Sequence, residues 1–343
     1  MRTVCHETVW IPRYGGPEVL EVRETDLPLP GPGEVTVSVK AAGVNFADLL
    51  ARKGFYRDAP PLPCVVGYEV AGVVEAAGAG VEPAWIGRGV LAFTRFGGYS
   101  EKVNLPIGAV FEKPENLGFE EAAALLVNYL TAYQLVVVMG GLRKGETVLI
   151  HNAGGGVGIA ALQIARRLGA VTLGTASASK HPFLKNEGLD HAIDYRTQDW
   201  EKEVRDLTGG RGVELILDPM GGPYWKKNYR LLRPTGRLGV FGASTVTESR
   251  AGRIPATLRL LTQVPLYNPL SLMDANRGVF GVNLGHLWKE AERVREWTLV
   301  ILEGVRLGHL RPRVDRSFPF ADAAGAHRHI EERRNTGKVL LVP

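Results

Sequence analysis

The spacing of apolar residues divides the chain into two parts with different patterns. Within residues 1–125, short segments alternate apolar and polar positions, as in EVTVSVKAAGV over 34–44, where three valines share one face. GYEVAGVVEAAG over 67–78 is a second apolar segment of strand length. A period of two is typical of β-strands with one buried face. Residues 1–125 are therefore predicted to be β-rich.

From about residue 145 the pattern changes to apolar strands that alternate with helices. TVLIHNA, VTLGTA and VELILDP are apolar runs of strand length, and VGIAALQIARRLG and DWEKEVRDLT have helical spacing. Strands separated by helices of this length form a parallel sheet with helices on both faces. The predicted fold class is α/β, in which a doubly wound parallel sheet follows the β-rich region.

The alternation stops over residues 244–276, where Pro255, Pro265 and Pro269 exclude one long helix. A loop of this length inside a compact domain is usually functional or disordered. Its leucine, tyrosine and methionine side chains favour a packed segment. A lid, a dimer arm and a membrane-facing patch all stay open as interpretations.

AALLVNYLTAYQLVVVMGG, over residues 123–141, approaches the length of about 20 residues that a membrane-spanning helix needs. Asn128, Thr131 and Gln134 interrupt this apolar run, and two glycines end it. A buried helix is therefore predicted here, and no transmembrane segment is expected.

Composition and charge narrow the classes of function. The chain has 343 residues, which corresponds to about two domains. Its net charge of +5 would suit a nucleic acid, but basic and acidic residues interleave in KEAERVRE and HIEERRN, as on solvated helix faces. No nucleic-acid partner is expected. Cys5 and Cys64 cannot form a disulfide framework, and no apolar run follows Met1, so a cytoplasmic location is expected.

The strongest local motif is TVLIHNAGGGVGIAALQIARRLG. A buried strand leads into a loop with the spacing Ala153-x-Gly155-x-x-Gly158, and a helix follows. This is the dinucleotide-binding fingerprint with alanine at its first glycine. Glycines let backbone N–H groups approach a pyrophosphate, which the helix N-terminus then attracts. A glycine-rich turn without a ligand is the alternative, and the surrounding strands and helices favour the cofactor.

The residues after the next strand indicate which dinucleotide binds. An NAD site has an acidic residue there for the ribose hydroxyls. This chain has Thr175-Ala-Ser177-Ala-Ser-Lys180 and no acidic residue before Glu187. Hydroxyl groups and a lysine suit a 2′-phosphate, so NADPH is the predicted cofactor. The alternative is that Lys180 only occupies the first turn of a helix.

Several long segments together resemble one family. The chain resembles the zinc-free quinone oxidoreductases of the medium-chain dehydrogenase/reductase superfamily over essentially its whole length, through YGGPEVLEV, GVNFADLLARKGFY, GYSE and NAGGGVG. FEEAAALLVNYLTAY, GTASASKH, LDPMGG, ANRGVFGVNLGHL and GKVLLVP are similar to the branch that contains the synaptic-vesicle membrane protein (vesicle amine transport protein) and its bacterial relatives. A shared fold does not by itself define the substrate.

Zinc-dependent members of this superfamily have cysteine where this chain has Asn45 and histidine where it has Tyr68. They also carry a four-cysteine lobe, to which nothing between residues 89 and 110 corresponds. No metal site is therefore expected. Without a Lewis acid an alkoxide is not stabilised as in an alcohol dehydrogenase, so alcohol oxidation is disfavoured.

The resemblance implies a domain organisation and a set of site residues. A GroES-like catalytic domain would comprise residues 1–125 and 286–343, and a Rossmann NADP-binding domain 126–285, with the insertion at about 244–276. Asn45, Tyr56 and Tyr68 are the implied catalytic residues. The implied cofactor contacts are Asn45, Phe46, Asp48, Thr131, Gly155, Gly156, Val157, Gly158, Ser177, Lys180, Tyr195, Phe241, Gly242, Ala243, Phe280, Gly281, Val282 and Arg334.

Some of these residues have other interpretations. Tyr195 could lie at the rim of the sheet, Phe280 in the core, and Asp48 could cap a helix. The local spacing around Arg334 differs from that of relatives, which weakens its assignment. Asn45 is harder to reassign, because it stands at the position of the lost zinc ligand.

The leading functional hypothesis is an NADPH-dependent reductase of quinones or other conjugated carbonyls. A 2-enoyl or enal reductase is the second, and the third is a nucleotide-binding protein with a membrane-trafficking or regulatory role and little turnover. The expected partners are a small quinone or enone substrate and a second copy of the chain in a homodimer. Peripheral membrane contact stays open.

Overall fold

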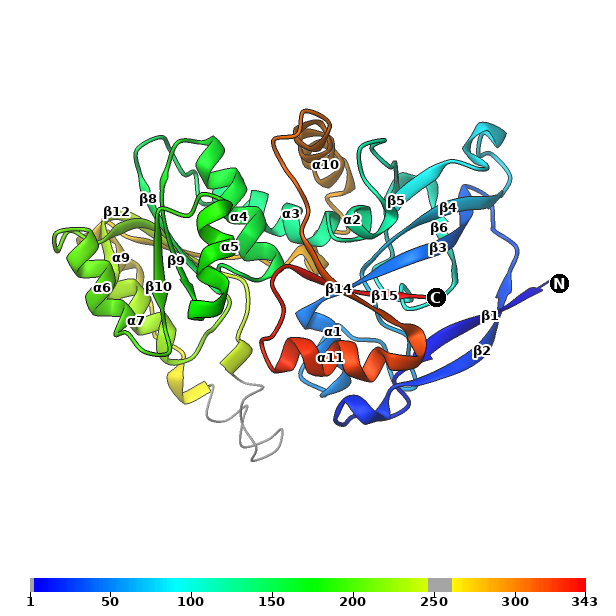
Figure 1. Cartoon of the computed structure of the whole chain (residues 1–343), viewed down its shortest axis with the longest axis horizontal. Helices are drawn as coiled ribbons and strands as arrows, with labels where there is room; N and C mark the ends of the chain where they lie inside the picture. Colours follow the sequence, from blue (N-terminus) through cyan, green and yellow to red (C-terminus); the bar gives the residue numbers. More distant parts are fainter. Residues whose placement is uncertain (1–2, 246–260) are drawn as a thin grey trace. The chain divides into compact units, whose positions relative to one another are not determined.

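The computed structural model describes residues 3–245 and 261–343, which form two compact units (Figure 1). Unit 1 is Met1–Asn128 with Leu287–Pro343, and unit 2 is Tyr129–His286. Much of the predicted insertion, residues 246–260, lies outside the described residues. Each unit has its own sheet and is described by itself.

Unit 2 contains the predicted parallel sheet. Six strands lie in the order β10-β9-β8-β11-β12-β13, and every neighbouring pair is parallel. Parallel strands that are buried on both faces read as continuous apolar runs, which is why the pattern was visible in the sequence. The strands are β8 (Thr147–His151), β9 (Val171–Ala176), β10 (His191–Asp194), β11 (Val213–Asp218), β12 (Leu232–Val240) and β13 (Gly278–Gly281).

Helices cover both faces of this sheet, which confirms the doubly wound α/β class. In Figure 1, α4 and α5 stand on one side of the sheet and α6 and α7 on the other. The apolar face of α4 is fully buried, including Ile159 and Leu162. The helices are α4 (Gly156–Arg167), α5 (His181–Asn186), α6 (Trp200–Leu207), α7 (Pro223–Leu231) and α9 (Pro269–Ala275).

The apolar run over residues 123–141 is buried, as predicted, but it is not one helix. It includes the end of α2 (Phe119–Ala123), all of α3 (Leu126–Tyr133) and a π-helical turn over Gln134–Val138. Most of its large apolar side chains are inaccessible to solvent, among them Leu125 and Leu130. Among the described residues, no helix is long and apolar enough to cross a membrane.

In the described part of the insertion, several apolar side chains are exposed within this chain. Leu266 is 91% exposed, Leu270 72% and Met273 70%, and Leu261 and Val264 are also exposed. These side chains belong to the segment that precedes β13, which is the edge strand of the six-stranded order. Tyr267, by contrast, packs against Tyr229, with 5.2 Å between the ring centres.

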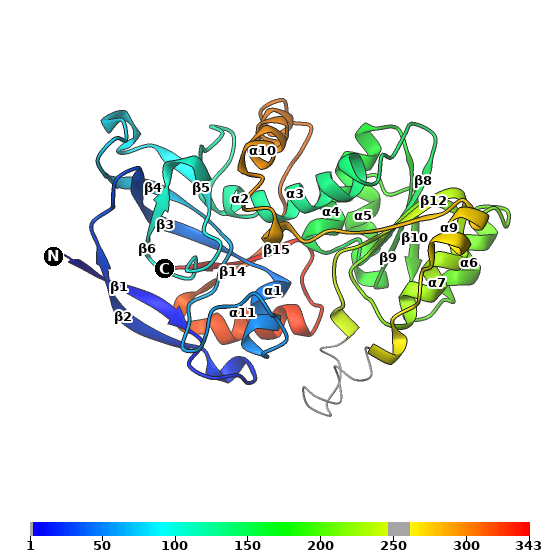
Figure 2. The same ribbon diagram turned by 180° about the vertical axis from the view of Figure 1, so that it is seen from behind.

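Unit 1 is β-rich, as predicted, and the C-terminal strand β15 lies in its main sheet next to β3, as the view from behind also shows (Figure 2). Its strand order is β14-β15-β3-β4-β5-β7, with β6 paired to β3, while β1 and β2 form a separate pair. The strands are β1 (Thr3–Trp10), β2 (Glu21–Pro28), β3 (Glu34–Val44), β4 (Glu69–Ala77), β5 (Gly89–Phe93), β6 (Lys102–Pro106), β7 (Val110–Glu112), β14 (Val314–Pro319) and β15 (Lys338–Val342).

The three valines of β3 that share a face, Val35, Val37 and Val39, are at most 2% exposed and lie in the core of unit 1. The last strand, β15, lies between β14 and β3, so residues from both ends of the sequence line this core. The longer helices of unit 1 are α1 (Phe46–Arg52), α10 (Ala291–Arg306) and α11 (Ala323–Glu331).

Candidate functional site

The glycine loop of unit 2 connects β8 to α4, as the sequence predicted. Gly155 precedes the first helical residue in an extended conformation. A Cβ atom at Gly155 would lie 2.6 Å from Asn152 Nδ2, and one at Gly158 would lie 2.4 Å from the Asn152 carbonyl oxygen. Backbone therefore excludes a side chain at Gly158, and one at Gly155 would have to displace the Asn152 amide. Without side chains here, backbone N–H groups at the start of a 12-residue helix can approach an anion.

Lys180 lies directly against this loop. A Cβ atom at Gly154 would be 2.8 Å from the Lys180 Cδ atom, so the aliphatic part of the lysine covers the glycine. Ser177 follows β9, and its hydroxyl is 3.2 Å from that of Ser179. The structure thus brings together the loop, the serine hydroxyls and the lysine that the sequence linked to a nucleotide phosphate.

Tyr195 follows β10, next to the end of β9. The register pairs Asp194 with Ala176, so Tyr195 and Ser177 leave neighbouring strands at the same edge of the sheet. The Tyr195 ring also packs partly against the core of unit 2, and the Arg196 guanidinium lies 5.9 Å from its centre. Both the cofactor contact and the rim interpretation stay compatible with this position.

The predicted residues on β12 and β13 also gather at one edge of the sheet. Val240 pairs with Gly281, and the Val282 N–H donates to the Val240 carbonyl at 2.9 Å. Phe241, Gly242 and Ala243 come directly after Val240.

Phe280 differs from its neighbours, because a Cβ atom at Gly239 would lie 2.7 Å from its ring. The Phe280 ring lies against its own sheet, which favours the core interpretation. Thr131, in α3, is 9% exposed.

In unit 1, Asn45 belongs to a buried network that includes two ionic side chains. The Lys338 Nζ donates to Asn45 Oδ1 at 2.7 Å and to Glu69 Oε1 at 2.5 Å. Asn45 Nδ2 lies 3.3 Å from Glu69 Oε1, and the other Glu69 oxygen accepts the Val127 N–H at 2.8 Å. Every polar atom of the Asn45 side chain therefore has a partner within unit 1.

Asp48 is fully buried and serves the local structure. Its carboxylate accepts the Asn45 N–H at 2.7 Å, the Gly67 N–H at 3.2 Å and the Tyr99 hydroxyl at 3.0 Å. Burial raises its pKa to about 6, and these hydrogen bonds oppose the rise. This arrangement at the start of α1 favours the helix-cap interpretation over a cofactor contact. Phe46, beside it, packs partly against the core.

Tyr56 and Tyr68 form an aromatic cluster with Phe96. The Tyr68 ring lies 6.2 Å from that of Tyr56, edge to face, and 5.2 Å from that of Phe96. The Tyr68 hydroxyl is buried and has no hydrogen-bond partner among the described residues. Burial raises the pKa of both tyrosines, and the nearby Tyr56 hydroxyl raises the pKa of Tyr68 further. The two hydroxyl groups do not have the distance and angles of a hydrogen bond.

Arg334 is an exposed residue of unit 1. It follows α11, its side chain is 57% exposed, and it pairs with Glu332 at 2.8 Å. A surface ion pair of this kind contributes little to stability and indicates no ligand. Its assignment stays a prediction that the structure does not support further.

Sequence reasoning did not identify Glu69, Lys338 or Phe96. A signal existed for the first two, because each is an ionic residue within an otherwise apolar strand, in GYEVAGVV and GKVLLVP. Ionic side chains are almost never fully buried unless they are paired. Nothing in the local sequence shows which carboxylate and which ammonium are partners. No comparable signal marks Phe96.

The former zinc-ligand positions do not fit a metal ion. Asn45 Oδ1 and Glu69 Oε1 are both occupied by the ammonium of Lys338, and a tyrosine replaces the histidine. Zinc is bound by thiolate, imidazole and carboxylate groups. Among residues 3–245 and 261–343, no group of three or more His, Cys, Asp or Glu side chains is arranged to hold a metal.

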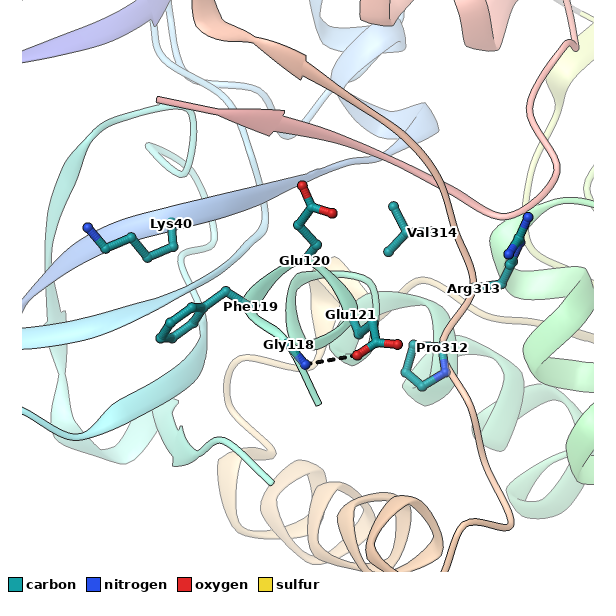
Figure 3. A pocket seen from close by; sticks show the side chains of 8 residues that line it. All are labelled: Lys40, Gly118, Phe119, Glu120, Glu121, Pro312, Arg313 and Val314. Carbon is teal, nitrogen blue, oxygen red and sulfur yellow. Dashed lines mark hydrogen bonds between the residues drawn. The ribbon is translucent and has the colours of Figure 1, made fainter. Parts of the chain in front are cut away.

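A pocket of unit 1 contains none of the predicted site residues. Figure 3 shows its lining: Lys40, Gly118, Phe119, Glu120, Glu121, Pro312, Arg313 and Val314. Its two glutamates bind groups of the protein itself, since Glu121 accepts the Gly118 N–H and Glu120 accepts the Ser317 hydroxyl, each at 2.8 Å. These contacts do not indicate a ligand.

We expect Lys338→Met to lower the free energy of unfolding by about 3–5 kcal/mol, because the buried Glu69 carboxylate would lose its counter-ion. The double variant Lys338→Met with Glu69→Gln should recover part of the loss, because the glutamine carbonyl can still accept the Val127 N–H. Denaturant unfolding of both single variants and the double variant measures this coupling. Strictly additive losses would contradict the assigned pair.

Known proteins support this architecture. Residues 31–115 match the family model described as alcohol dehydrogenase GroES-like domain, and residues 187–341 match the model described as zinc-binding dehydrogenase. The synaptic vesicle membrane protein VAT-1 homolog of Rattus norvegicus is 44% identical over 325 residues, which cover 94% of this chain and 80% of that protein.

Solved structures of similar proteins also match this chain over nearly its whole length. The quinone oxidoreductase of Escherichia coli in complex with NADPH superposes with a TM-score of 0.86 at 30% identity, over 98% of this chain and 100% of that chain. The CurK enoyl reductase gives 0.85 at 26% identity, over 98% and 99%. The chain therefore belongs to the medium-chain dehydrogenase/reductase superfamily of nicotinamide-dependent oxidoreductases, among the VAT-1 homologues and quinone oxidoreductases.

Proposed function

We propose that this protein is an NADPH-dependent reductase that transfers a hydride to quinones or other conjugated carbonyl compounds without a metal ion. The observation that carries the cofactor assignment is the position of Lys180 against Gly154 of the glycine loop. The reported complex of the Escherichia coli quinone oxidoreductase with NADPH supports it.

The residues around the loop account for the preference for a phosphorylated ribose. Ser177 supplies a hydroxyl and Lys180 a positive charge, and no carboxylate lies between them to repel a 2′-phosphate. The loop glycines and the first turn of α4 would hold the pyrophosphate through backbone N–H groups. NADH would lack the partner for Lys180, so it should bind more weakly.

We place the acceptor against Tyr68 of unit 1. A buried hydroxyl without a partner costs about 1–3 kcal/mol, and a carbonyl oxygen of the acceptor would satisfy it. Tyr56 would form the adjacent edge of the slot. The resemblance implies Asn45 as a catalytic residue and cofactor contact, but its amide is already bonded to Lys338 and Glu69. We propose that Asn45 instead stabilises the backbone just before α1.

The chain contributes orientation more than proton transfer. When bound, reduced nicotinamide supplies a hydride from its C4 atom. Tyr68 donates a hydrogen bond that polarises the acceptor carbonyl and holds it in place. Because burial raises the pKa of Tyr56 and Tyr68, neither phenol is a good acid at neutral pH. The reduced acceptor takes its proton from water.

Two other functions remain in view. A 2-enoyl or enal reductase would use the same slot, and the likeness to the CurK enoyl reductase favours it as the second candidate. A nucleotide-binding role in membrane trafficking would also need the glycine loop, and the name of the rat relative suggests it. The unpartnered Tyr68 hydroxyl favours an enzyme, because a nucleotide sensor needs no group for an acceptor.

We also propose a homodimer that forms along β13. This strand is at the edge of the described sheet, and the exposed side chains of Leu266, Leu270 and Met273 lie in the segment just before it. A second copy would cover both the edge and the apolar side chains. The cytoplasmic location stays a prediction.

Lys180→Glu should weaken NADPH binding by about 1–3 kcal/mol, or about 5–150-fold in Kd, through lost attraction and added repulsion at the 2′-phosphate. The Kd for NADH should change little. Fluorescence titration with both cofactors measures the two values. Lys185→Glu is a matched control, because Lys185 is exposed one turn further along α5. Equal losses for NADPH and NADH would return Lys180 to a structural role.

Activity should survive prolonged treatment with a chelator, because Lys338 already occupies the oxygens at the former metal position. Elemental analysis of the purified protein should find well under one zinc per chain. Stoichiometric zinc, or activity that is lost to the chelator and restored by zinc, would refute the metal-free mechanism.

The reaction itself is tested with NADPH that carries deuterium at C4. With an enone, the product should retain deuterium at its β-carbon, and with a quinone the rate should show a primary isotope effect. Tyr68→Phe should lower kcat/KM by about tenfold through the lost hydrogen bond, whereas Tyr56→Phe should change it little. If NADPH stays unoxidised with every quinone and enone, the reductase proposal fails and the nucleotide-binding role replaces it.

A further inference from the structure

The residues before Tyr99 form a strained turn next to Tyr68. The Phe96 N–H donates to the Thr94 carbonyl at 2.6 Å, and the intervening Arg95 has a φ of 58°. A three-residue turn with a positive φ is rare, and a non-glycine residue adopts it only when the surroundings impose it. Arg95 is exposed, so its own side chain does not account for the conformation. Such strain often accompanies a functional position.

Hydrogen bonds fix this turn to the segment that leads into β4. The Thr94 N–H donates to the Tyr68 carbonyl at 3.0 Å, and the Thr94 hydroxyl donates to the Gly67 carbonyl at 2.6 Å. The Gly97 N–H donates to the Val65 carbonyl at 3.1 Å. Hydrogen bonds therefore hold the turn on both sides of Phe96. In this position, the Phe96 ring lies at an interplanar angle of 54° to the Tyr68 ring.

We propose that Phe96 determines which acceptors reach Tyr68, an inference that rests on the proposed function. The Tyr68 ring is flanked by Tyr56 and Phe96, both of which are only partly buried, while its own hydroxyl is covered. On this proposal, an acceptor that bonds to this hydroxyl lies against one of these two rings. Tyr56 carries a hydroxyl that can also orient a carbonyl. Phe96 has no polar group, so its effect is on the size and shape of the slot.

A purely structural role for Phe96 predicts a different outcome. Phe96 packs partly against the core of unit 1, and so does Phe318 of β14. If Phe96 only fills space, truncating either phenylalanine should lower stability and leave the choice of acceptor unchanged. If Phe96 shapes the slot, only its truncation should change that choice.

The experiment compares the wild type with Phe96→Ala, Phe96→Leu and the control Phe318→Ala. The acceptors are duroquinone, with one ring, and 9,10-phenanthrenequinone, with three. The methyl groups of duroquinone also prevent addition by the exposed Cys5 thiol. Phe96→Ala should raise the ratio of kcat/KM for the larger to the smaller quinone by about tenfold, the effect of altering a pocket by a few carbon atoms. Phe96→Leu should change it less, and Phe318→Ala should leave it unchanged.

The Kd for NADPH should stay within twofold in all three variants, which shows that unit 2 is intact. An unchanged ratio in Phe96→Ala, or the same change in Phe318→Ala, would overturn the proposal. A wild type without turnover would instead refute the reductase function. In that case equilibrium dialysis measures the affinities for two redox-inert ligands, 2,3,5,6-tetramethylphenol and 9-phenanthrol. If Phe96→Ala leaves the ratio of these two affinities unchanged, the role of Phe96 is refuted as well.

Discussion

The ion pair between Lys338 and Glu69 joins the parts of unit 1 on which its candidate site depends. Both side chains are almost completely buried, at 3% and 1% exposure. A single buried charge would cost several kcal/mol, so each ion requires the other together with further hydrogen bonds. Asn45 and the Val127 N–H provide those bonds. The beginnings of α1, β4 and β15 are thereby held together, and Tyr68 is the residue immediately before Glu69.

This arrangement changes the chemistry that the former zinc-ligand positions can support. An ammonium now binds the oxygens that could otherwise face a cation, and a phenol replaces an imidazole. Next to these positions, unit 1 has an aromatic cluster with one buried hydroxyl that has no hydrogen-bond partner among the described residues. The candidate site of unit 2 differs from that of unit 1. It depends on backbone N–H groups of the glycine loop, which are accessible because the glycines have no side chains. Binding of a phosphate by N–H groups needs glycines, whereas orientation of a planar acceptor needs rings.

Elements with a local cause were predictable from the sequence. Apolar runs separated by helical spacing gave the parallel sheet, and Ala153-x-Gly155-x-x-Gly158 gave the loop, because both depend on neighbouring residues. The run over 123–141 was correctly placed in the interior, but its division into α3 and a π-helical turn was not visible. The apolar content of residues 261–275 favours packing, whereas Leu266, Leu270 and Met273 are exposed within this chain. Hydrophobicity alone does not show whether the covering surface belongs to the same chain.

By itself, the sequence determined the class of fold, the family, the glycine loop before α4 and the absence of the usual zinc ligands at positions 45 and 68. Only the tertiary structure paired Lys338 with Glu69, which are 269 residues apart, and placed Phe96 against Tyr68. It also decided that Asn45 and Asp48 are engaged within unit 1. The physical reason is burial: the energy of a charge or a hydroxyl depends on what surrounds it in space, and the chain neighbours of these residues do not supply those surroundings.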